Sequence, residues 1–394
     1  MKGLGLSKNV VILGIVSLLN DIGSEMIYPF LPLFLTQVLK ARLSFVGLVE
    51  GTAESAASIL KLVSGHISDR FKLRKGLIVG GYSISAVARP FIAMALYPWH
   101  ILLLRFSDRL GKGLRAAPRD ALLADSCQEY ERGAAFGFHR AMDHVGAILG
   151  PSLAFLLLSL YHTADYRILF WVASIPGLLA IPLIIIFLSE IRPKERVERS
   201  SLLAFDHFSG TFKKFLVVMI LFTLGNSSDA FLILRAKSLG IGLTSIPILW
   251  IFLHIVKMVS SYPAGIISDR IGRKKVIISG WIIYFLVYIG FGFSFSALHI
   301  WLLFPIYGFF FGLTEGVEKA LVSDLVDPKT RGTAFGAYNF AIGIANLPAS
   351  LLMGILWDFF GVAFAFSFGG LLALSAALLL ALWVKPERGS IKVQ

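Results

Sequence analysis

Apolar runs of about twenty residues recur along the whole chain and restrict its fold more than any other feature. A run of this length crosses a bilayer as an α-helix, because a backbone in lipid must satisfy its hydrogen bonds within its own segment. We expect twelve spans, at residues 9–38, 44–68, 76–96, 98–125, 133–160, 167–190, 213–238, 243–268, 275–294, 297–325, 332–357 and 361–384. A composition of 56% hydrophobic and 15% charged residues agrees with this, and an all-α membrane protein is predicted.

The basic residues are distributed unevenly between the loops. The formal net charge of +13 could indicate nucleic-acid binding, but the lysines and arginines gather in alternate connections, near 70–75, 192–199, 270–275, 329–331 and 385–392. The positive-inside rule then predicts a multi-pass protein of a bacterial inner membrane with both termini in the cytoplasm. Contact with anionic lipid explains the remaining excess, so the lipid bilayer is an expected partner and nucleic acid is not. The single cysteine, Cys127, excludes an intrachain disulfide and a cysteine-based metal site, and no metal or cofactor is expected.

The two halves of the chain repeat each other. The longest polar stretch divides the chain into an N-terminal six-helix bundle (1–190), a cytoplasmic linker (191–212) and a C-terminal bundle with a short tail (213–394). The segment that begins at Gly65, GHISDR, recurs from Gly265 as GIISDR, and RGAAFG at 132–137 recurs as RGTAFG at 331–336. Because each half has an even number of spans, both copies have the same orientation, related by an axis along the membrane normal.

The repeated loops carry a resemblance to a known family. GHISDRFKLRKG and GIISDRIGRKKV resemble the loop signature of the major facilitator superfamily. In that signature a glycine is followed by an aspartate–arginine pair and then by glycine, arginine and two lysines. The second copy fits fully, whereas the first has Lys72 where the family prefers glycine. The resemblance covers the whole chain. It implies twelve transmembrane helices in two pseudo-symmetric bundles that rock about a central site, which gives alternating access.

Two of these motifs have more than one interpretation. The residues of the repeated loops are predicted to form a cytoplasmic gate, a latch that closes that side in one state only, although ordinary loop charge is the alternative. This set comprises Gly65, Asp69, Arg70, Gly265, Asp269 and Arg270. The segment from Gly146 to Pro151 is similar to a family motif often met in exporters. Its glycines indicate either close helix packing or a bendable helix that controls leak.

The span at 98–125 carries seven charges where a lipid-facing helix would carry none. On a helical wheel these charges fall within an arc of roughly 140°. They are Arg105, Asp108, Arg109, Lys112, Arg115, Arg119 and Asp120. Since a charge at the bilayer centre costs from about 2.5 to above 10 kcal/mol, this stripe must line a wet cavity or a bundle interior.

Two acids cannot neutralise the five bases of this stripe, so other helices must contribute. The predicted substrate-binding residues are Arg105, Arg109, Lys112, Arg115, Arg119, Arg140, Asn226, Asp229, Glu315 and Asn339. The predicted proton-coupling residues are Asp21, Glu25, Glu50, Glu54, Asp143 and His144, of which we favour Asp21 and Glu25, with Glu54 next. The repeat offset relates Arg119 to Glu318 and Asp120 to Lys319, which predicts a complementary pair across the axis and also an alternating salt bridge. Permanent pairing and substrate coordination both remain open for the stripe.

Four tryptophans lie near the predicted membrane interfaces. Trp99, Trp171, Trp250 and Trp357 are assigned to the aromatic belt.

These features predict a proton-coupled secondary active transporter, monomeric, that moves a polar charged small molecule. Arginines grip carboxylates, which favours an organic anion or zwitterion, including a carboxylate-rich metallophore or siderophore or its metal complex. The alternative is a proton-antiport multidrug exporter in which the stripe is a structural ion network. An enzyme is not expected, because His139, Asp143 and His144 are the nearest approach to a catalytic cluster and the two histidines lie about 140° apart on a helix. A receptor on a transporter fold is disfavoured by the two intact loop motifs.

Overall fold

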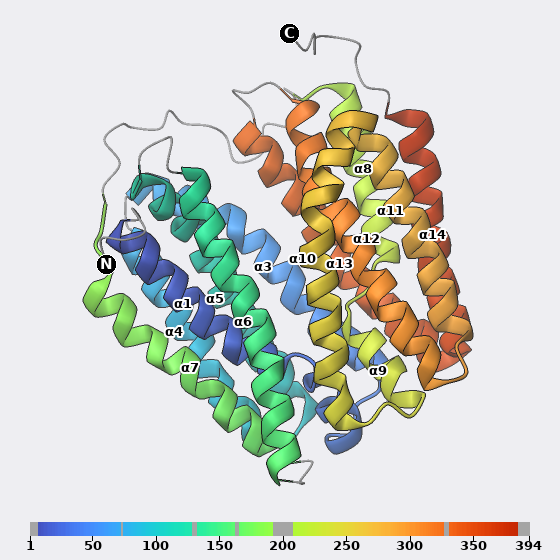
Figure 1. Cartoon of the computed structure of the whole chain (residues 1–394), viewed down its shortest axis with the longest axis horizontal. Coiled ribbons are helices and arrows are strands. Elements are labelled where there is room, and N and C mark those ends of the chain that lie inside the picture. Colours follow the sequence, from blue (N-terminus) through green and yellow to red (C-terminus); the bar gives the residue numbers. More distant parts are fainter. Residues whose placement is uncertain are drawn as a thin grey trace.

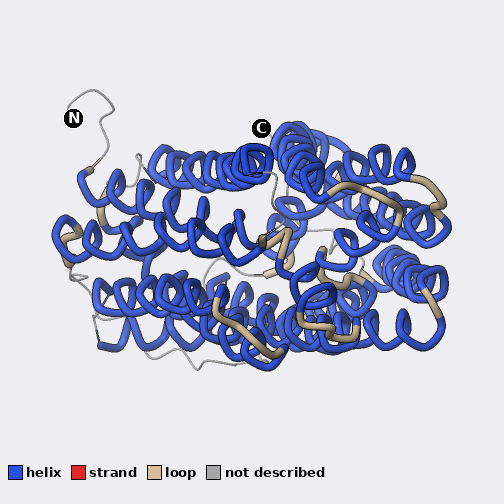
Figure 2. Tube along the Cα trace, turned by 90° about the horizontal axis from the view of Figure 1, so that it is seen from below, coloured by secondary structure: helices blue, strands red, loops and turns tan. Residues whose placement is uncertain are grey.

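The computed structural model describes residues 7–71, 74–127, 132–161, 165–191, 208–326 and 331–384, and these residues contain helices and no strand. The first half comprises α1 (Lys8–Ile27), α2 (Leu31–Leu33), the π-helix η1 (Phe34–Val38), α3 (Leu43–Phe71), α4 (Arg74–Ala93), α5 (Pro98–Asp125), α6 (Arg132–Tyr161) and α7 (Tyr166–Phe187). The second comprises α8 (Gly210–Gly225), α9 (Ala230–Ser238), the 3₁₀ turn η4 (Leu243–Ser245), α10 (Ile246–Ile271), α11 (Arg273–Phe293), α12 (Ala297–Asp324), α13 (Arg331–Phe360) and α14 (Val362–Trp383). The loops that the structure describes between these helices are short (Figure 2).

The predicted spans agree with these helices to within a few residues. Among the described residues, 11 helical segments are long and apolar enough to cross a membrane. The remaining span is α5, whose 28 residues have the necessary length but carry the charged stripe. The all-α membrane fold predicted from the sequence is therefore confirmed. The predicted linker, 191–212, lies largely outside the described residues, and α8 begins at Gly210, inside its predicted end.

The first and seventh spans are broken at repeat-related positions. The first turns at Tyr28 between α1 and α2, where Pro29 and Pro32 supply no backbone N–H. The seventh is interrupted at 226–229 between α8 and α9. The two breaks meet, because the hydroxyls of Tyr28 and Ser228 lie 3.4 Å apart. Irregular backbone at membrane depth is tolerated where it is buried in protein or lines a cavity, so the breaks mark the region between the halves.

The two halves lie side by side and diverge towards one end (Figure 1). They approach each other near α9 and the start of α3, and they separate at the end where α1 begins and α14 ends. Helices α3 and α13 form the main contact between them. Glycine permits this contact, since a β-carbon at Gly51 would lie 2.8 Å from the Cα of Leu347. The hydroxyl of Ser55 also donates to the carbonyl of Gly343 at 2.5 Å and accepts from the amide of Leu347 at 3.0 Å.

The closed end carries a helix cap that crosses between the halves. The carboxylate of Asp358, on α13, accepts hydrogen bonds from the amides of Leu43 and Ser44 at 3.2 and 2.8 Å. These amides belong to the first turn of α3 and have no partner within their own helix. A negative charge also complements the positive end of the helix dipole. One half therefore caps a helix of the other.

Candidate functional site between the two halves

The charged stripe of α5 is divided between its neighbours, because α5 packs between α3 and α4. Towards α3, Arg105 donates from Nε and Nη2 to both carboxylate oxygens of Glu50, at 3.2 and 3.1 Å. One turn further, Nε of Arg109 lies 3.1 Å from Oε1 of Glu54. Both acids come from α3. Each of these two arginines therefore has a carboxylate partner within its own half.

Towards α4, the stripe meets polar groups that hold α5 in place. Asp108 lies 3.4 Å from Nη2 of Arg89. Arg115 donates to the hydroxyl of Ser85 at 2.7 Å, and its guanidinium lies 4.3 Å above the ring of Tyr82. Arg115 is buried between α4 and α5 rather than directed at the other half.

Arg119, nearer the end of α5, bonds to its neighbour Asp120 at 3.0 and 2.9 Å. The predicted pair between Arg119 and Glu318 does not form in this structure, and an alternating salt bridge between them stays a prediction. Instead, the buried carboxylate of Glu318 accepts from Trp281 Nε1 at 3.1 Å and from the hydroxyl of Tyr338 at 2.9 Å. The halves repeat each other in sequence, but the second half satisfies this acid with its own aromatic side chains.

The residue that sequence reasoning missed is Arg89. This arginine lies buried on α4 and donates to the backbone carbonyl of Asn20 at 3.0 Å and to its amide oxygen at 2.8 Å. With Asp108 it joins α1, α4 and α5. A single arginine inside the apolar span at 76–96 was the available signal, since a charge at that depth requires a partner.

Two lysines on the same surface have no such partner among the described residues. Lys61 on α3 and Lys112 on α5 are partly exposed, and neither makes a hydrogen bond or ion pair within the part of the chain that the structure describes. Lys112 interacts electrostatically with Lys61, Arg109, Glu54 and Asp21. Glu54 is already paired with Arg109, so this surface keeps a positive excess.

The predicted acids of α1 and α6 have different surroundings. Asp21 accepts a hydrogen bond from Asn20 at 3.0 Å and stays within its own half. Glu25, one turn on, accepts from Trp250 Nε1 at 2.9 Å and lies 3.9 Å from Nε2 of His254, both on α10. The structure thus joins Glu25 to the second half. Trp250 is only 4% exposed, so its assignment to the aromatic belt was wrong.

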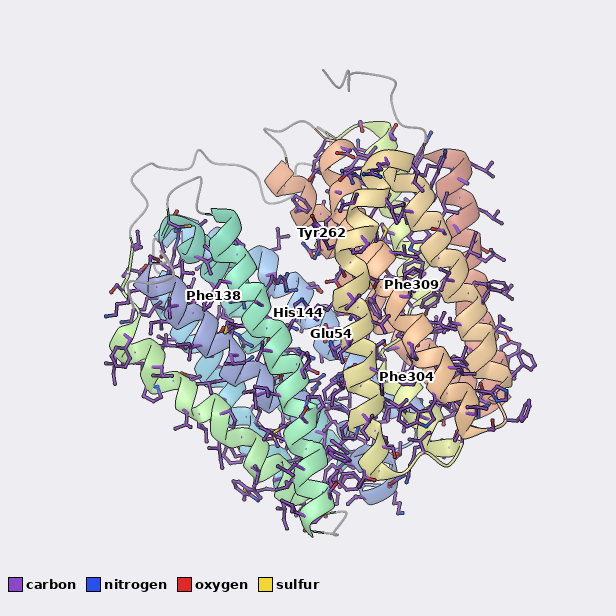
Figure 3. The ribbon with its side chains drawn as sticks, in the orientation of Figure 1. Glu54, Phe138, His144, Tyr262, Phe304 and Phe309 are labelled. Carbon is purple, nitrogen blue, oxygen red and sulfur yellow. The ribbon has the colours of Figure 1, made fainter. Side chains whose placement is uncertain are left out.

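On α6, Asp143 accepts from the hydroxyl of Ser17 at 2.6 Å and lies 3.4 Å from Nδ1 of His139 and 3.7 Å from Arg140. His144 is exposed on the same helix. In Figure 3, His144 and Glu54 both lie between the two halves. Asp143 is therefore held by α1 and its own helix, whereas His144 is accessible.

The second half contributes fewer charges to this region. Asp229, at the break of the seventh span, accepts from the hydroxyl of Tyr307 at 2.6 Å. Lys257 lies 3.7 Å above the ring of Phe311 and interacts electrostatically with Asp229 and Glu315. Glu315 and Lys319 form a loose pair at 3.9 Å. Several inner side chains are substantially exposed, with fractions of 40% for Glu54, 65% for Arg140, 56% for Glu315 and 47% for Lys319. The facing surfaces of the halves are thus polar and accessible.

The two predicted asparagines play smaller parts here. Asn226 follows the last residue of α8, and its backbone N–H donates to the carbonyl of Thr223 at 3.0 Å. Asn339 donates from its side chain to the carbonyl of Phe335 on its own helix at 2.8 Å. Both are partly exposed.

The predicted gate residues lie at the diverging end. The side chains of Asp69 and Arg70 lie outside the described residues, and Gly65 packs against Ala117 of α5, where a β-carbon would lie 3.3 Å away. Asp269 pairs with Arg273, which also lies 3.4 Å from Asp324. Gly265 has open space beside it, and Arg270 is exposed. The latch stays a prediction, since these contacts remain within the second half.

The glycines of the α6 motif pack closely against α1. A β-carbon at Gly146 would lie 2.8 Å from the β-carbon of Asp21, and one at Gly150 would lie 2.7 Å from the carbonyl oxygen of Ile22. The packing interpretation of this motif therefore has a direct geometric basis, because a larger residue would separate the helices.

Comparison with known proteins identifies the family. The family model of the Major Facilitator Superfamily matches residues 13–256 and 215–394, which together span nearly the whole chain. The chain belongs to the major facilitator superfamily. It is 37% identical over 382 residues to an uncharacterized MFS-type transporter of Methanocaldococcus jannaschii, a match that covers 95% of this chain and 94% of that protein.

One solved structure and one further relative extend this comparison. The crystal structure of a D-xylose-proton symporter superposes with a TM-score of 0.77 at 17% identity, covering 97% of this chain and 99% of that one. Multidrug resistance protein MdtH of Photorhabdus laumondii is 28% identical over 158 residues, which is 40% of this chain and 38% of that protein. The fold and family are those of multi-pass membrane transporters that act on small molecules, not of enzymes.

Proposed function

We propose that this protein is a proton-coupled secondary active transporter of a polar, charged small molecule. Residues 1–190 and 213–394 act as the two rocking units, joined by the linker at 191–212, in a monomer of the cytoplasmic (inner) membrane with both termini in the cytoplasm. The solute is an organic anion or zwitterion, and a carboxylate-rich metallophore or its metal complex belongs to this class. Polar, exposed side chains on the facing surfaces of the halves support a hydrophilic solute.

The contact between Glu25 and α10 is the observation that carries this proposal. Its carboxylate is the predicted proton-coupling acid whose hydrogen bond crosses between the halves, through Trp250, with His254 beside it. Protonation of Glu25 removes its charge and weakens the charge-assisted bond to Trp250. Proton binding therefore changes a contact that the rocking motion must break or form, which is the requirement for coupling.

Transport by reconstituted protein tests this function. Proteoliposomes loaded with a mixture of organic anions and zwitterions are assayed for counterflow exchange and for uptake driven by an imposed pH gradient. We expect the unmodified protein to show both activities and Glu25→Gln to retain counterflow while losing gradient-driven accumulation. The matched control is Asp165→Asn, because Asp165 caps α7 on the surface and asparagine keeps the cap.

Each part of the proposal can fail separately. If no charged solute exchanges, transport of this solute class is wrong. If Glu25→Gln still accumulates solute against a pH gradient, the proton is carried by another acid.

The second candidate is a proton-antiport multidrug exporter, favoured by the partial match to a multidrug resistance protein. In that case the stripe on α5 is a structural ion network, in accordance with its many internal pairs. The polar facing surfaces argue against it, since a pocket for apolar cations would be mostly apolar and aromatic. Exchange of tetraphenylphosphonium in the same liposomes would support it.

A further inference from the structure

The arginines of α5 are poorly placed to hold a substrate anion, because each already has a partner. Arg105 and Arg109 are paired with acids of α3, Arg115 is held by Ser85 and Tyr82, and Arg119 is bonded to Asp120. An incoming anion would have to displace the carboxylate bound to Arg105, Arg109 or Arg119, or enter the buried contact of Arg115 with α4. Breaking such a pair leaves its other member without compensation.

Lys61 and Lys112 are bonded differently from these arginines. Both side chains are partly exposed, and within the described residues neither has an ion pair or hydrogen bond. They interact electrostatically with each other, so their charges repel. The segments that carry them are packed together, since the hydroxyl of Ser64 on α3 donates to the carbonyl of Gly113 on α5 at 2.8 Å. Two ammonium groups on neighbouring helices repel each other unless an anion joins them.

A third lysine approaches from the other half. Lys319 on α12 interacts electrostatically with Lys61 across the space between the halves. Its own partner, Glu315, lies 3.9 Å away, and both side chains are about half exposed, so this pair neutralises little. Like charges thus face each other where the halves diverge, and they oppose closure of that end.

We infer that Lys61 and Lys112 bind an anionic group of the transported solute and that Lys319 completes the site as the halves close. This inference rests on the proposed function and specifies its solute as one that carries a carboxylate or phosphate. Lysine suits the task, since each ammonium supplies three donors on a flexible stem that can follow a moving ligand. The bound anion reduces the repulsion between Lys61 and Lys319, so binding of the solute favours the approach of the two halves at this end.

Binding to the purified full-length protein tests the site. Thermal shift and equilibrium binding are measured with citrate, glutamate, glycerol 3-phosphate, inorganic phosphate, D-xylose and tetraphenylphosphonium. We expect an anion of this panel to stabilise the protein, and Lys61→Gln or Lys112→Gln to weaken its binding about tenfold, as the loss of one charge-assisted hydrogen bond implies. Lys61→Arg keeps the charge and should retain binding, and Lys213→Gln, on the exposed start of α8, is the matched control. The carboxylate and phosphate probes distinguish the two kinds of anion.

Closure is measured separately, through the reactivity of a cysteine at Tyr262, in a Cys127→Ser background. Tyr262 is 78% exposed on α10 and lies on the side of that helix nearer the first half (Figure 3). We expect the stabilising anion to slow labelling by a membrane-impermeant maleimide, and Lys319→Gln to slow it without anion. A Lys319→Arg variant should behave as the unmodified protein does.

The outcomes separate the inference from the function on which it rests. If an anion binds equally well to the unmodified protein and to both glutamine variants, the lysine site is wrong while anion transport stands. If only D-xylose or tetraphenylphosphonium stabilises the protein and exchanges in liposomes, the anion site is wrong and transport stands. If no solute of the panel stabilises the protein or exchanges, the proposed function fails together with the site.

Discussion

At the scale of single residues, the interior of the first half is organised by arginine–carboxylate pairs. Arg105 and Glu50 are both buried and share two hydrogen bonds, and the guanidinium of Arg105 lies 5.2 Å above the ring of Tyr28. The pair therefore links α3 and α5 to the break in the first span. Its geometry is bidentate, the arrangement in which arginine binds carboxylate most strongly.

Removing one member of this pair should destabilise the protein strongly. Glu50→Gln removes the bidentate partner of the buried Arg105 and leaves it only the longer contact to Asp108 at 3.6 Å, and we expect a loss of about 3–5 kcal/mol, seen as a lower Tm in detergent. Replacing both residues, as Glu50→Leu with Arg105→Met, should cost less than the single change. A double variant that is less stable than Glu50→Gln would contradict this account.

Part of this network could be predicted from the sequence. The surplus of bases on α5 required acids from elsewhere, and Glu50 and Glu54, on one helical face, were among the predicted residues. The contribution of Arg89 was not foreseen, because helical periodicity gives the face of a residue but not the helix that packs against it. For the same reason, the sequence could not show that Arg115 turns towards α4.

At the scale of elements, the contact between α3 and α13 combines close glycine packing with the cap from Asp358. We expect Asp358→Asn to weaken the cap, because an amide oxygen accepts the same hydrogen bonds without the charge. The loss should be about 0.5–1 kcal/mol of the stability of the closed end. Faster labelling of a cysteine placed at Ser44, in the Cys127→Ser background, would report it. Unchanged labelling would show that the cap has no part in holding this end closed.

The glycine contact allows a more severe test. Gly51→Leu places a branched side chain where a β-carbon alone would lie 2.8 Å from Leu347 and 2.9 Å from its carbonyl oxygen. We expect the halves to separate along α3, with loss of transport and a marked fall in Tm. Gly76→Leu is the matched control, since nothing lies within 4 Å of a β-carbon there. Equal behaviour of the two variants would exclude a special role for this contact.

The helices themselves were largely predictable, whereas their interruptions were not. Length and hydropathy gave the apolar spans, and α5 was included because a stripe of charge on one face still permits a buried helix. The segment at 213–238 was expected to be continuous but breaks at 226–229. The polar run Asn-Ser-Ser-Asp was the signal. It was outweighed by apolar residues on both sides, although asparagine, serine and aspartate compete for backbone hydrogen bonds and favour helix ends.

At the scale of the whole molecule, the structure is closed at one end and open at the other. Asp358, the Tyr28–Ser228 contact and the Glu25–Trp250 bond join the halves, while the lysines and acids further along α3, α5 and α12 stay exposed. Alternating access requires the reverse arrangement in another state. The sequence implied this motion through the family resemblance, but it could not indicate which end is closed here, since both states have the same sequence.

Locking the closed end should therefore stop transport without abolishing binding. Cysteines at Ser44 and Asp358, joined by a short reducible thiol cross-linker in the Cys127→Ser background, would hold α3 to α13. We expect solute exchange to fall to background and to recover on reduction, while a thermal shift by solute persists. Continued exchange in the cross-linked protein would mean that these helices do not separate during the cycle.

The two lysines of the inferred anion site have an electrical consequence. In the proposed rocking motion Lys61 and Lys112 move with the first half, so without solute their charges shift within the membrane field each time the protein changes state. One elementary charge that crosses the full membrane is worth about 2.3 kcal/mol per 100 mV. Reorientation of the empty carrier should then depend on voltage, whereas a bound anion cancels much of the moving charge. We expect a potential imposed with potassium and valinomycin to alter net transport much more than solute exchange, and to lose that effect in the Lys61→Gln, Lys112→Gln double variant.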